Sequence, residues 1–301
     1  MTLLDRAIVR LLPVVPRPVV KRFSSPYIAG PTLDDAVRVV RGLNAAGKMA
    51  TVDVLGEEVE RTEETRLIAQ TYGNVFGEIE RDGLDSNVSV KLTALGLGLS
   101  YELCRENLQT VLEAAAASGN FVRIDMEDSS TTSQTLQLYG ELRDGCHDNV
   151  GVVLQAYLRR TLDDVAALGA NANVRLCKGI YIEPPSLAFT DPEDVRTSFV
   201  HALDALVESG AYVGIATHDE WLIERALERV AGLDVRSYEF QMLLGVRESR
   251  ASELVAGGHR LRVYVPFGQH WYGYSLRRLQ ENPAMAGTIA RAAVDRAFGR
   301  A

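Results

Sequence analysis

A set of polar side chains interrupts segments that otherwise consist of valine, isoleucine, leucine and aromatic residues. They are Lys91, Asp125, Gln155, Arg175, Lys178, Tyr181, Thr217, His218, Gln241 and Tyr264. Most of them fall late in their segments. Burying one lysine or aspartate costs several kcal/mol of free energy unless the charge is paired. A structural pair, such as Lys91 with Asp125, would explain any single member, but a bound ligand explains the whole set better.

The chemistry of this set favours an anionic ligand rich in hydrogen-bonding groups. Lysine, arginine, glutamine and threonine side chains suit a phosphorylated substrate or a flavin nucleotide. No second histidine lies two or four residues from His218, and the 3 cysteines follow no zinc-ligand pattern, so we expect no metal. No G-x-S-x-G motif is present, and no histidine lies near Cys177 in the sequence, which argues against nucleophilic hydrolysis.

A second cationic group follows the last apolar segment, in HWYGYSLRRLQENP (270–283). The group consists of Tyr274, Arg277, Arg278 and Glu281. Helical spacing would place them within about one turn of one another. Two adjacent arginines could hold a carboxylate through bidentate hydrogen bonds. An exposed helix with an ion pair between Arg277 and Glu281 explains the same residues equally well, so the spacing leaves both interpretations open.

Apolar segments of strand length alternate with amphipathic segments of helical periodicity from residue 49 onward. Strands are expected at 49–56, 88–95, 121–127, 150–157, 174–181, 212–218, 238–245 and 260–268. Helices are expected at 57–81, 106–118, 193–210 and 219–230, with Asp219 as the N-cap of the last.

This alternation predicts an α/β fold, and it favours a (βα)8 TIM barrel. A doubly wound sheet is the alternative, but the sequence contains neither G-x-G-x-x-G nor G-x-x-x-x-G-K-[ST]. In a barrel, the C-terminal ends of the strands meet at one mouth. We therefore expect the polar set to form one site there.

Composition and charge narrow the class further. The chain of 301 residues is 47% hydrophobic and 24% charged, as in globular proteins. Its 32 basic and 40 acidic residues give a net charge of -8, which argues against nucleic-acid binding, since that depends on neutralising phosphates. An odd number of widely spaced cysteines is typical of a reducing compartment, so we expect a cytoplasmic protein.

The sequence predicts an N-terminal helical extension at 1–44 and the barrel at 45–301. Residues 1–23 are basic and apolar, but charged residues interrupt every apolar run. The runs are therefore too short for the apolar core of a signal peptide or for a membrane-spanning helix. Two interpretations remain open. The segment is either a helix that docks on the barrel, broken by its prolines, or an amphipathic segment that contacts the inner face of a membrane.

Motifs along most of the chain occur in the order found in one enzyme family. They are VSVKLTALGL, FVRIDMEDS, VVLQAYLRRT, VRLCKGIY, IATHD, YEFQMLLGV, RVYVPFG and YSLRRLQENP. Over roughly 45–285 the chain resembles the proline dehydrogenase family, especially its short monofunctional bacterial members and the corresponding domain of proline utilization A. The resemblance implies a distorted (βα)8 barrel that holds FAD non-covalently, with its last helix over the barrel mouth.

The resemblance also implies a reaction. L-Proline would be oxidised to Δ1-pyrroline-5-carboxylate, with hydride transfer to flavin N5 and electron transfer to a membrane quinone. This is the first step of proline catabolism to glutamate. Tyr264 implies a preference for proline over hydroxyproline. The sequence does not predict the oligomeric state.

The resemblance assigns roles to individual residues. Substrate would be held at its carboxylate by Lys91, Arg277 and Arg278 and at its ring by Tyr264 and Tyr274. FAD would contact Met126, Gln155, Arg175, Lys178, Gly179, Ile180, Thr217, His218 and Glu281. Glu57 would close the site by pairing with Arg277. Arg175 would lie near flavin N5 and Asp125 would pair with the basic cluster; whether Asp125 also acts as a base stays open.

Other classes compete with this interpretation. A barrel aldolase or lyase could use Lys91 to form a Schiff base. Methylenetetrahydrofolate reductases also bind FAD in a similar barrel, but the R-R-x-x-E-N helix is not typical of them. A binding protein that kept the fold without catalysis is the third alternative. The retained acidic and basic residues argue against it.

Overall fold

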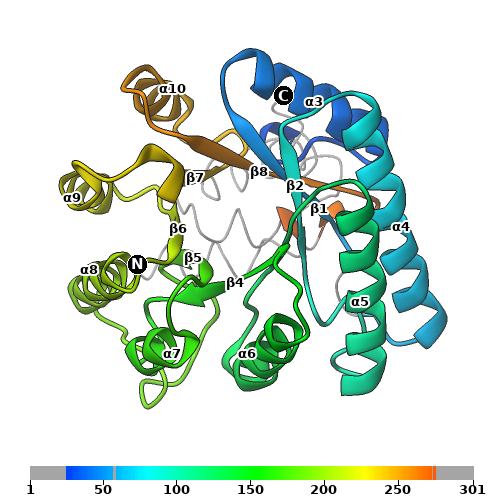
Figure 1. Cartoon of the computed structure of the whole chain (residues 1–301), viewed down its shortest axis with the longest axis horizontal. Helices are drawn as coiled ribbons and strands as arrows, with labels where there is room; N and C mark the ends of the chain where they lie inside the picture. Colours follow the sequence, from blue (N-terminus) through cyan, green and yellow to red (C-terminus); the bar gives the residue numbers. More distant parts are fainter. Residues whose placement is uncertain (1–24, 57–58, 273, 276–301) are drawn as a thin grey trace, which may run out of the picture.

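The computed structural model describes residues 25–56, 59–272 and 274–275, and all structural statements concern these residues (Figure 1). Parallel strands form one closed barrel in sequence order, and the last strand pairs with the first. The strands are β1 (Met49–Val54), β2 (Ser86–Val90), β3 (Val122–Ile124), β4 (Val150–Gln155), β5 (Asn173–Cys177), β6 (Tyr212–Ala216), β7 (Tyr238–Leu243) and β8 (Leu261–Phe267). The predicted (βα)8 barrel is confirmed.

Helices surround the strands (Figure 1). They are α3 (Leu33–Ala45), α4 (Thr62–Arg81), α5 (Tyr101–Ala117), α6 (Ser129–Asp144), α7 (Thr161–Leu168), α8 (Pro192–Glu208), α9 (Glu220–Val230) and α10 (Glu248–Ala256), with 3-10 turns η2 (Ser25–Tyr27) and η3 (Val235–Ser237). From α4 to α10, each helix follows a strand. None of the helices in the described ranges is long and apolar enough to cross a membrane.

Helix α3 completes the ring of helices although it precedes the first strand. It packs against β1 and β8, and Ala36, Val37 and Val40 on its inner face are buried. A capping box between Thr32 and Asp35 fixes its start. It therefore covers the barrel between β8 and β1, where the helix after the eighth strand lies in a regular barrel. The division at residue 44 stays a prediction.

Each predicted segment overlaps its strand and extends past the strand's C-terminal end, whereas β2 and β5 begin before their predicted segments. β2 ends at Val90, and 92–99 form successive turns. Leu92 and Leu95 there are buried, and their carbonyl groups accept hydrogen bonds from side chains of α5. These residues are apolar because they pack beneath helices, so the sequence pattern resembles a longer strand. At β5, the strand ends before Gly179, whose φ is +103°.

Helix boundaries also differ from the prediction at two N-termini. The helix expected at 57–81 begins at Thr62, and the helix expected at 106–118 begins at Tyr101, where the Ser100 side chain accepts a hydrogen bond from Leu103 N. At α5 the polar N-cap side chain sets the start more strongly than apolar periodicity does, whereas Arg61, the N-cap of α4, makes no capping hydrogen bond through its side chain. The predicted cap at Asp219 is confirmed, because its side chain accepts from Trp221 N.

Side chains alternate along most strands between an apolar outer face and a polar interior, although Val153 of β4 and Ala216 of β6 also line the cavity. Val88, Val90 and Ile124 belong to the apolar core that the helices share. The intervening residues meet inside the barrel: Thr51 Oγ1 lies 3.2 Å from Ser89 Oγ. The interior of this barrel is therefore charged and hydrogen-bonded.

Candidate active site

A cavity of about 650 Å³ opens at the C-terminal ends of the strands. Every predicted site residue that the structure describes lines it: Lys91, Asp125, Met126, Gln155, Arg175, Lys178, Gly179, Ile180, Thr217, His218, Tyr264 and Tyr274. The volume is in the range typical of small-molecule and cofactor sites. Glu57, Arg277, Arg278 and Glu281 lie outside the described residues, so their predicted roles stay predictions.

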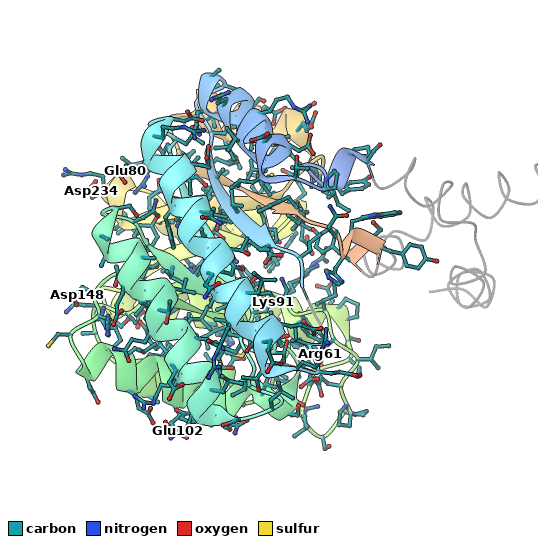
Figure 2. The ribbon with its side chains drawn as sticks, turned by 90° about the vertical axis from the view of Figure 1, so that its right-hand side faces the viewer. Arg61, Glu80, Lys91, Glu102, Asp148 and Asp234 are labelled. Carbon is teal, nitrogen blue, oxygen red and sulfur yellow. The ribbon has the colours of Figure 1, made fainter. Side chains whose placement is uncertain are left out.

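Lys91 directly follows β2 at the cavity end of the barrel. Figure 2 shows it at the same end as Arg61, whereas Glu80 and Asp148 lie at the opposite end. Its Nζ donates to Asp53 Oδ2 at 2.8 Å and to Tyr264 OH at 3.2 Å. The ammonium group therefore sits among oxygen atoms from different strands.

Asp53 is a site residue that the sequence analysis missed. The expected ion pair of Lys91 with Asp125 is present, with Asp125 Oδ2 at 3.9 Å from Nζ, but the carboxylate that accepts the hydrogen bond belongs to Asp53 on β1. The Asp53 side chain is 1% exposed. Burial raises the pKa of Asp53, and the Lys91 ammonium opposes that rise.

Arg175 on β5 donates hydrogen bonds to acceptors on three sides of its guanidinium. Nε donates to Gln241 Oε1 at 2.5 Å, Nη1 to Asp125 Oδ1 at 2.6 Å, and Nη2 to Ser89 Oγ at 3.1 Å. The side chain is 8% exposed, at the floor of the cavity. Since a guanidinium is planar and always charged, these contacts fix both its position and its orientation.

Tyr264 on β8 makes the second hydrogen bond to the Asp125 carboxylate. Its hydroxyl donates to Asp125 Oδ2 at 2.8 Å, so both carboxylate oxygens of Asp125 accept hydrogen bonds. Burial, with the negative charges of Asp125 and Asp53, raises the pKa of Tyr264 well above its usual value. Tyr264 therefore stays protonated and remains a donor. The Arg175 guanidinium also lies 5.4 Å from the Tyr264 ring centroid.

The opposite wall of the cavity carries an acceptor that no described residue satisfies. Gln155 Nε2 donates to the carbonyl oxygens of Met126 and Glu127, each at 3.2 Å. Its Oε1 is buried and receives no hydrogen bond within the described part of the chain. A buried amide oxygen without a partner costs about 1–3 kcal/mol. A ligand N–H in the cavity would remove that cost.

Lys178 and Asp219 form the polar rim beside this wall. Lys178 Nζ donates to Asp219 Oδ2 at 3.2 Å, and Arg196 donates to both oxygens of the same carboxylate. Burial acts to raise the pKa of Asp219, but the hydrogen bonds from Arg196 and Lys178 outweigh it and lower the pKa. Lys178 is 42% exposed, so its ammonium can also reach an anion in the cavity.

The donor set of the cavity suits an anionic organic ligand. Across the described ranges, no group of three or more His, Cys, Asp or Glu residues could hold a metal ion. Cations, amides and aromatic rings line the cavity instead. A parallel barrel with such a cavity at the C-terminal ends of its strands defines the class of TIM-barrel enzymes with an anionic substrate or cofactor.

Comparison with known proteins narrows this class to one family. The profile of the proline dehydrogenase family matches residues 36–291. Proline dehydrogenase 1 of Bacillus subtilis subsp. natto is 37% identical over 268 residues, which cover 88% of each chain. The proline dehydrogenase of Deinococcus radiodurans is 32% identical over 275 residues, again 88% of each chain. The chain therefore belongs to the proline dehydrogenase family and is an oxidoreductase, as the resemblance predicted.

A solved structure agrees with the fold. Proline utilization A from Bdellovibrio bacteriovorus matches with a TM-score of 0.82 at 24% sequence identity. The match covers 92% of this chain and 36% of that longer chain. The barrel seen here is thus also found within a larger protein.

Proposed function

We propose that this chain oxidises L-proline to Δ1-pyrroline-5-carboxylate with bound FAD, in the first step of proline catabolism to glutamate. The observation that carries the proposal is the network of Asp53, Lys91, Tyr264, Asp125 and Arg175 on the cavity floor. It places two cations and a protonated hydroxyl at one buried site. These are the groups that an amino acid carboxylate and an electron-accepting ring require.

The substrate carboxylate is assigned to the side of the cavity that Lys91 lines. Arg277 and Arg278, from the predicted C-terminal helix, would supply the bidentate hydrogen bonds, and Glu57 would close the site. Tyr264 and Tyr274 line the same cavity and would pack around the proline ring. Tyr274 is anchored in an apolar cluster with Ile28 and Leu55, so its position is fixed from outside the site.

The protonation state of proline decides whether it can react. Loss of hydride from the carbon next to nitrogen needs a neutral amine, whose lone pair forms the new double bond to carbon. Nearby cations favour the neutral form of an amine. Asp125 is a poor base, because both of its oxygens already accept hydrogen bonds from cationic or hydroxyl donors. We therefore assign Asp125 to positioning and the proton to solvent.

The cavity residues fit a flavin nucleotide. Gln155 Oε1 is a buried acceptor in need of an N–H, and Lys178 and Thr217 on the rim suit polar groups of the nucleotide. Met126, Gly179, Ile180, His218 and, by resemblance, Glu281 complete this assignment. Bound FAD would supply the hydride acceptor at N5. Arg175 would hold its fixed positive charge near the ring, which gains negative charge on reduction.

Electron transfer to a membrane quinone completes the proposal, with a cytoplasmic protein that contacts the inner face of a membrane. Reduction of a soluble quinone analogue by the proline-reduced protein tests the acceptor. Co-sedimentation with anionic vesicles tests the contact.

The experiment that tests the function is an absorption spectrum of the purified protein before and after anaerobic L-proline. We expect visible flavin bands that bleach with proline. Flavin bands that do not change with proline would indicate a different substrate, and hydroxyproline and a folate would be tested next. A colourless protein that stays inactive with added FAD would overturn the proposal. Borohydride trapping on Lys91 with a carbonyl substrate would then support a Schiff-base enzyme.

Replacing Gly179 by alanine should weaken FAD binding by about tenfold or more. Gly179 has a φ of +103°, and a Cβ there would lie 2.1 Å from Cδ1 of the buried Tyr157 ring. The loop must therefore shift, and Lys178 and Ile180 shift with it. Fluorescence titration with FAD measures the loss. Gly98→Ala is the control, because a Cβ at Gly98 meets nothing within 4 Å; equal affinities in the two variants would contradict the prediction.

A further inference from the structure

We infer that Glu239, a buried carboxylate on β7, is a positioning residue that fixes the Arg175 guanidinium through the side-chain amide of Gln241. The role in catalysis rests on the proposed function, because that proposal places Arg175 against the flavin. Glu239 is not among the described residues that line the cavity. It can act on the reaction only through the side chains above it.

The contacts form a continuous chain from the barrel interior to the site. Arg262 on β8 donates from Nε to Glu239 Oε1 at 2.7 Å and from Nη1 to Ala50 O at 2.6 Å. Gln241 Nε2 donates to the same Glu239 oxygen at 2.6 Å, and Gln241 Oε1 accepts from Arg175 Nε at 2.5 Å. All four side chains are buried. Each end of the Gln241 amide therefore has one charged partner.

The charge of Glu239 sets the donor-to-acceptor direction of this series of hydrogen bonds. A carboxylate only accepts hydrogen bonds, whereas an amide has a donor end and an acceptor end. Glu239 takes the donor end of Gln241, so the acceptor end must face Arg175. If the amide were reversed, its NH2 group would face the guanidinium, donor against donor. Arg175 would then lose its Nε contact.

Two features keep this arrangement in place. Burial acts to raise the pKa of Glu239, but the charge and hydrogen bond of Arg262 outweigh it, and the pKa lies at about 2. Glu239 is therefore a carboxylate at neutral pH. Gly214 on β6 leaves the space for the amide, because a Cβ there would lie 2.4 Å from Gln241 Nε2.

A purely structural role explains these contacts less well. Replacing a buried ion pair by apolar residues of similar volume is often neutral or stabilising. A buried carboxylate outside the cavity provides the matched control. Asp164 on α7 is 7% exposed, and both of its oxygens accept hydrogen bonds from Arg160 Nε. Asp164 is not among the described residues that line the cavity, so Asp164→Asn removes a paired carboxylate away from the site.

The test compares Glu239→Gln with Asp164→Asn. Glutamine keeps the shape of glutamate but also donates, so Gln241 loses its fixed direction in Glu239→Gln. We expect kcat for proline to fall by about tenfold or more, with KM changed much less because Lys91 and the substrate side of the cavity are untouched. The midpoint potential of bound flavin should fall by about 30 mV. For a two-electron couple, this shift corresponds to a tenfold decrease in the equilibrium constant for reduction. Asp164→Asn should leave the potential unchanged, because the partner of Asp164 is Arg160 and neither residue lines the cavity.

Crystal structures of the wild type and Glu239→Gln without cofactor give a readout that does not depend on the proposed function. We expect Arg175 Nε to lose its hydrogen bond to Gln241 in the variant. If Glu239→Gln does not fold, the double variant Glu239→Gln with Arg262→Met is tested in its place, because the second substitution removes the unbalanced cation. An unmoved Arg175, or a wild-type potential and kcat, would overturn the inference. A wild type that neither binds flavin nor oxidises proline would overturn the proposed function instead.

Discussion

Replacing Arg175 by methionine should lower the turnover of L-proline by about 10²–10³-fold. The guanidinium is fixed at the cavity floor by Gln241, Asp125 and Ser89, so its charge needs no reorganisation during the reaction. Such preorganised charge stabilises a developing anion far more than a mobile charge in water does. Stopped-flow measurement of flavin reduction by proline isolates this step from reoxidation.

Two comparisons separate this effect from a loss of structure. Arg175→Lys keeps the positive charge but cannot make three directed hydrogen bonds, so its rate should lie between the wild type and Arg175→Met. Arg236→Met removes a charge from the protein surface, where its partner is Asp234, and should leave reduction unchanged. Flavin reduction at the wild-type rate in Arg175→Met would show that the charge at the cavity floor does not act on the reaction.

The barrel was predictable from the sequence because its strands are buried beneath helices on their outer face. Valine, isoleucine and leucine at every second position leave apolar runs that stand out, as in 150–157 and 212–218. The ends of the runs were less predictable. Leu92 and Leu95 continue the apolar pattern after β2 although the chain has turned, because burial beneath a helix and burial in a sheet select the same side chains.

The site was predicted in part. Residues late in the strands, such as Asp125 and Tyr264, line the cavity as expected. Asp53, Glu239 and Arg262 were missed, because each lies within an apolar run and no motif marks it. A signal was present, since Glu239 and Arg262 each lie two residues before a predicted cavity residue and side chains two apart on a strand point the same way. Their partners could not be predicted, because pairing across the barrel depends on the register of different strands.

Replacing Lys91 by methionine should have two effects that can be separated. The first is a rise in KM for proline of about 10- to 100-fold, from the loss of one charge-assisted hydrogen bond to the carboxylate. The second is a loss of about 3–5 kcal/mol in the free energy of unfolding at neutral pH, because the buried Asp53 carboxylate loses its cation. Steady-state kinetics and urea unfolding measure them.

The pH dependence of the stability loss follows from Asp53. Burial already raises the pKa of this carboxyl in the folded protein, and removing the Lys91 ammonium, which opposes the rise, must raise it further. A group whose pKa is higher in the folded state stabilises the fold at low pH, and that contribution is lost as the pH rises through the folded pKa. The deficit of Lys91→Met relative to the wild type should therefore shrink as the pH falls toward 4.

A second substitution distinguishes the ion pair from the binding of substrate. Asp53→Asn in the Lys91→Met background removes the unpaired charge, so stability should return toward the wild type and the pH dependence of the deficit should disappear. The high KM should remain, because the cation that faces the substrate is still absent. Recovery of both properties together would show that Lys91 only balances Asp53. Recovery of stability alone would show that Lys91 binds the carboxylate of proline and that Asp53 holds the Lys91 ammonium in position.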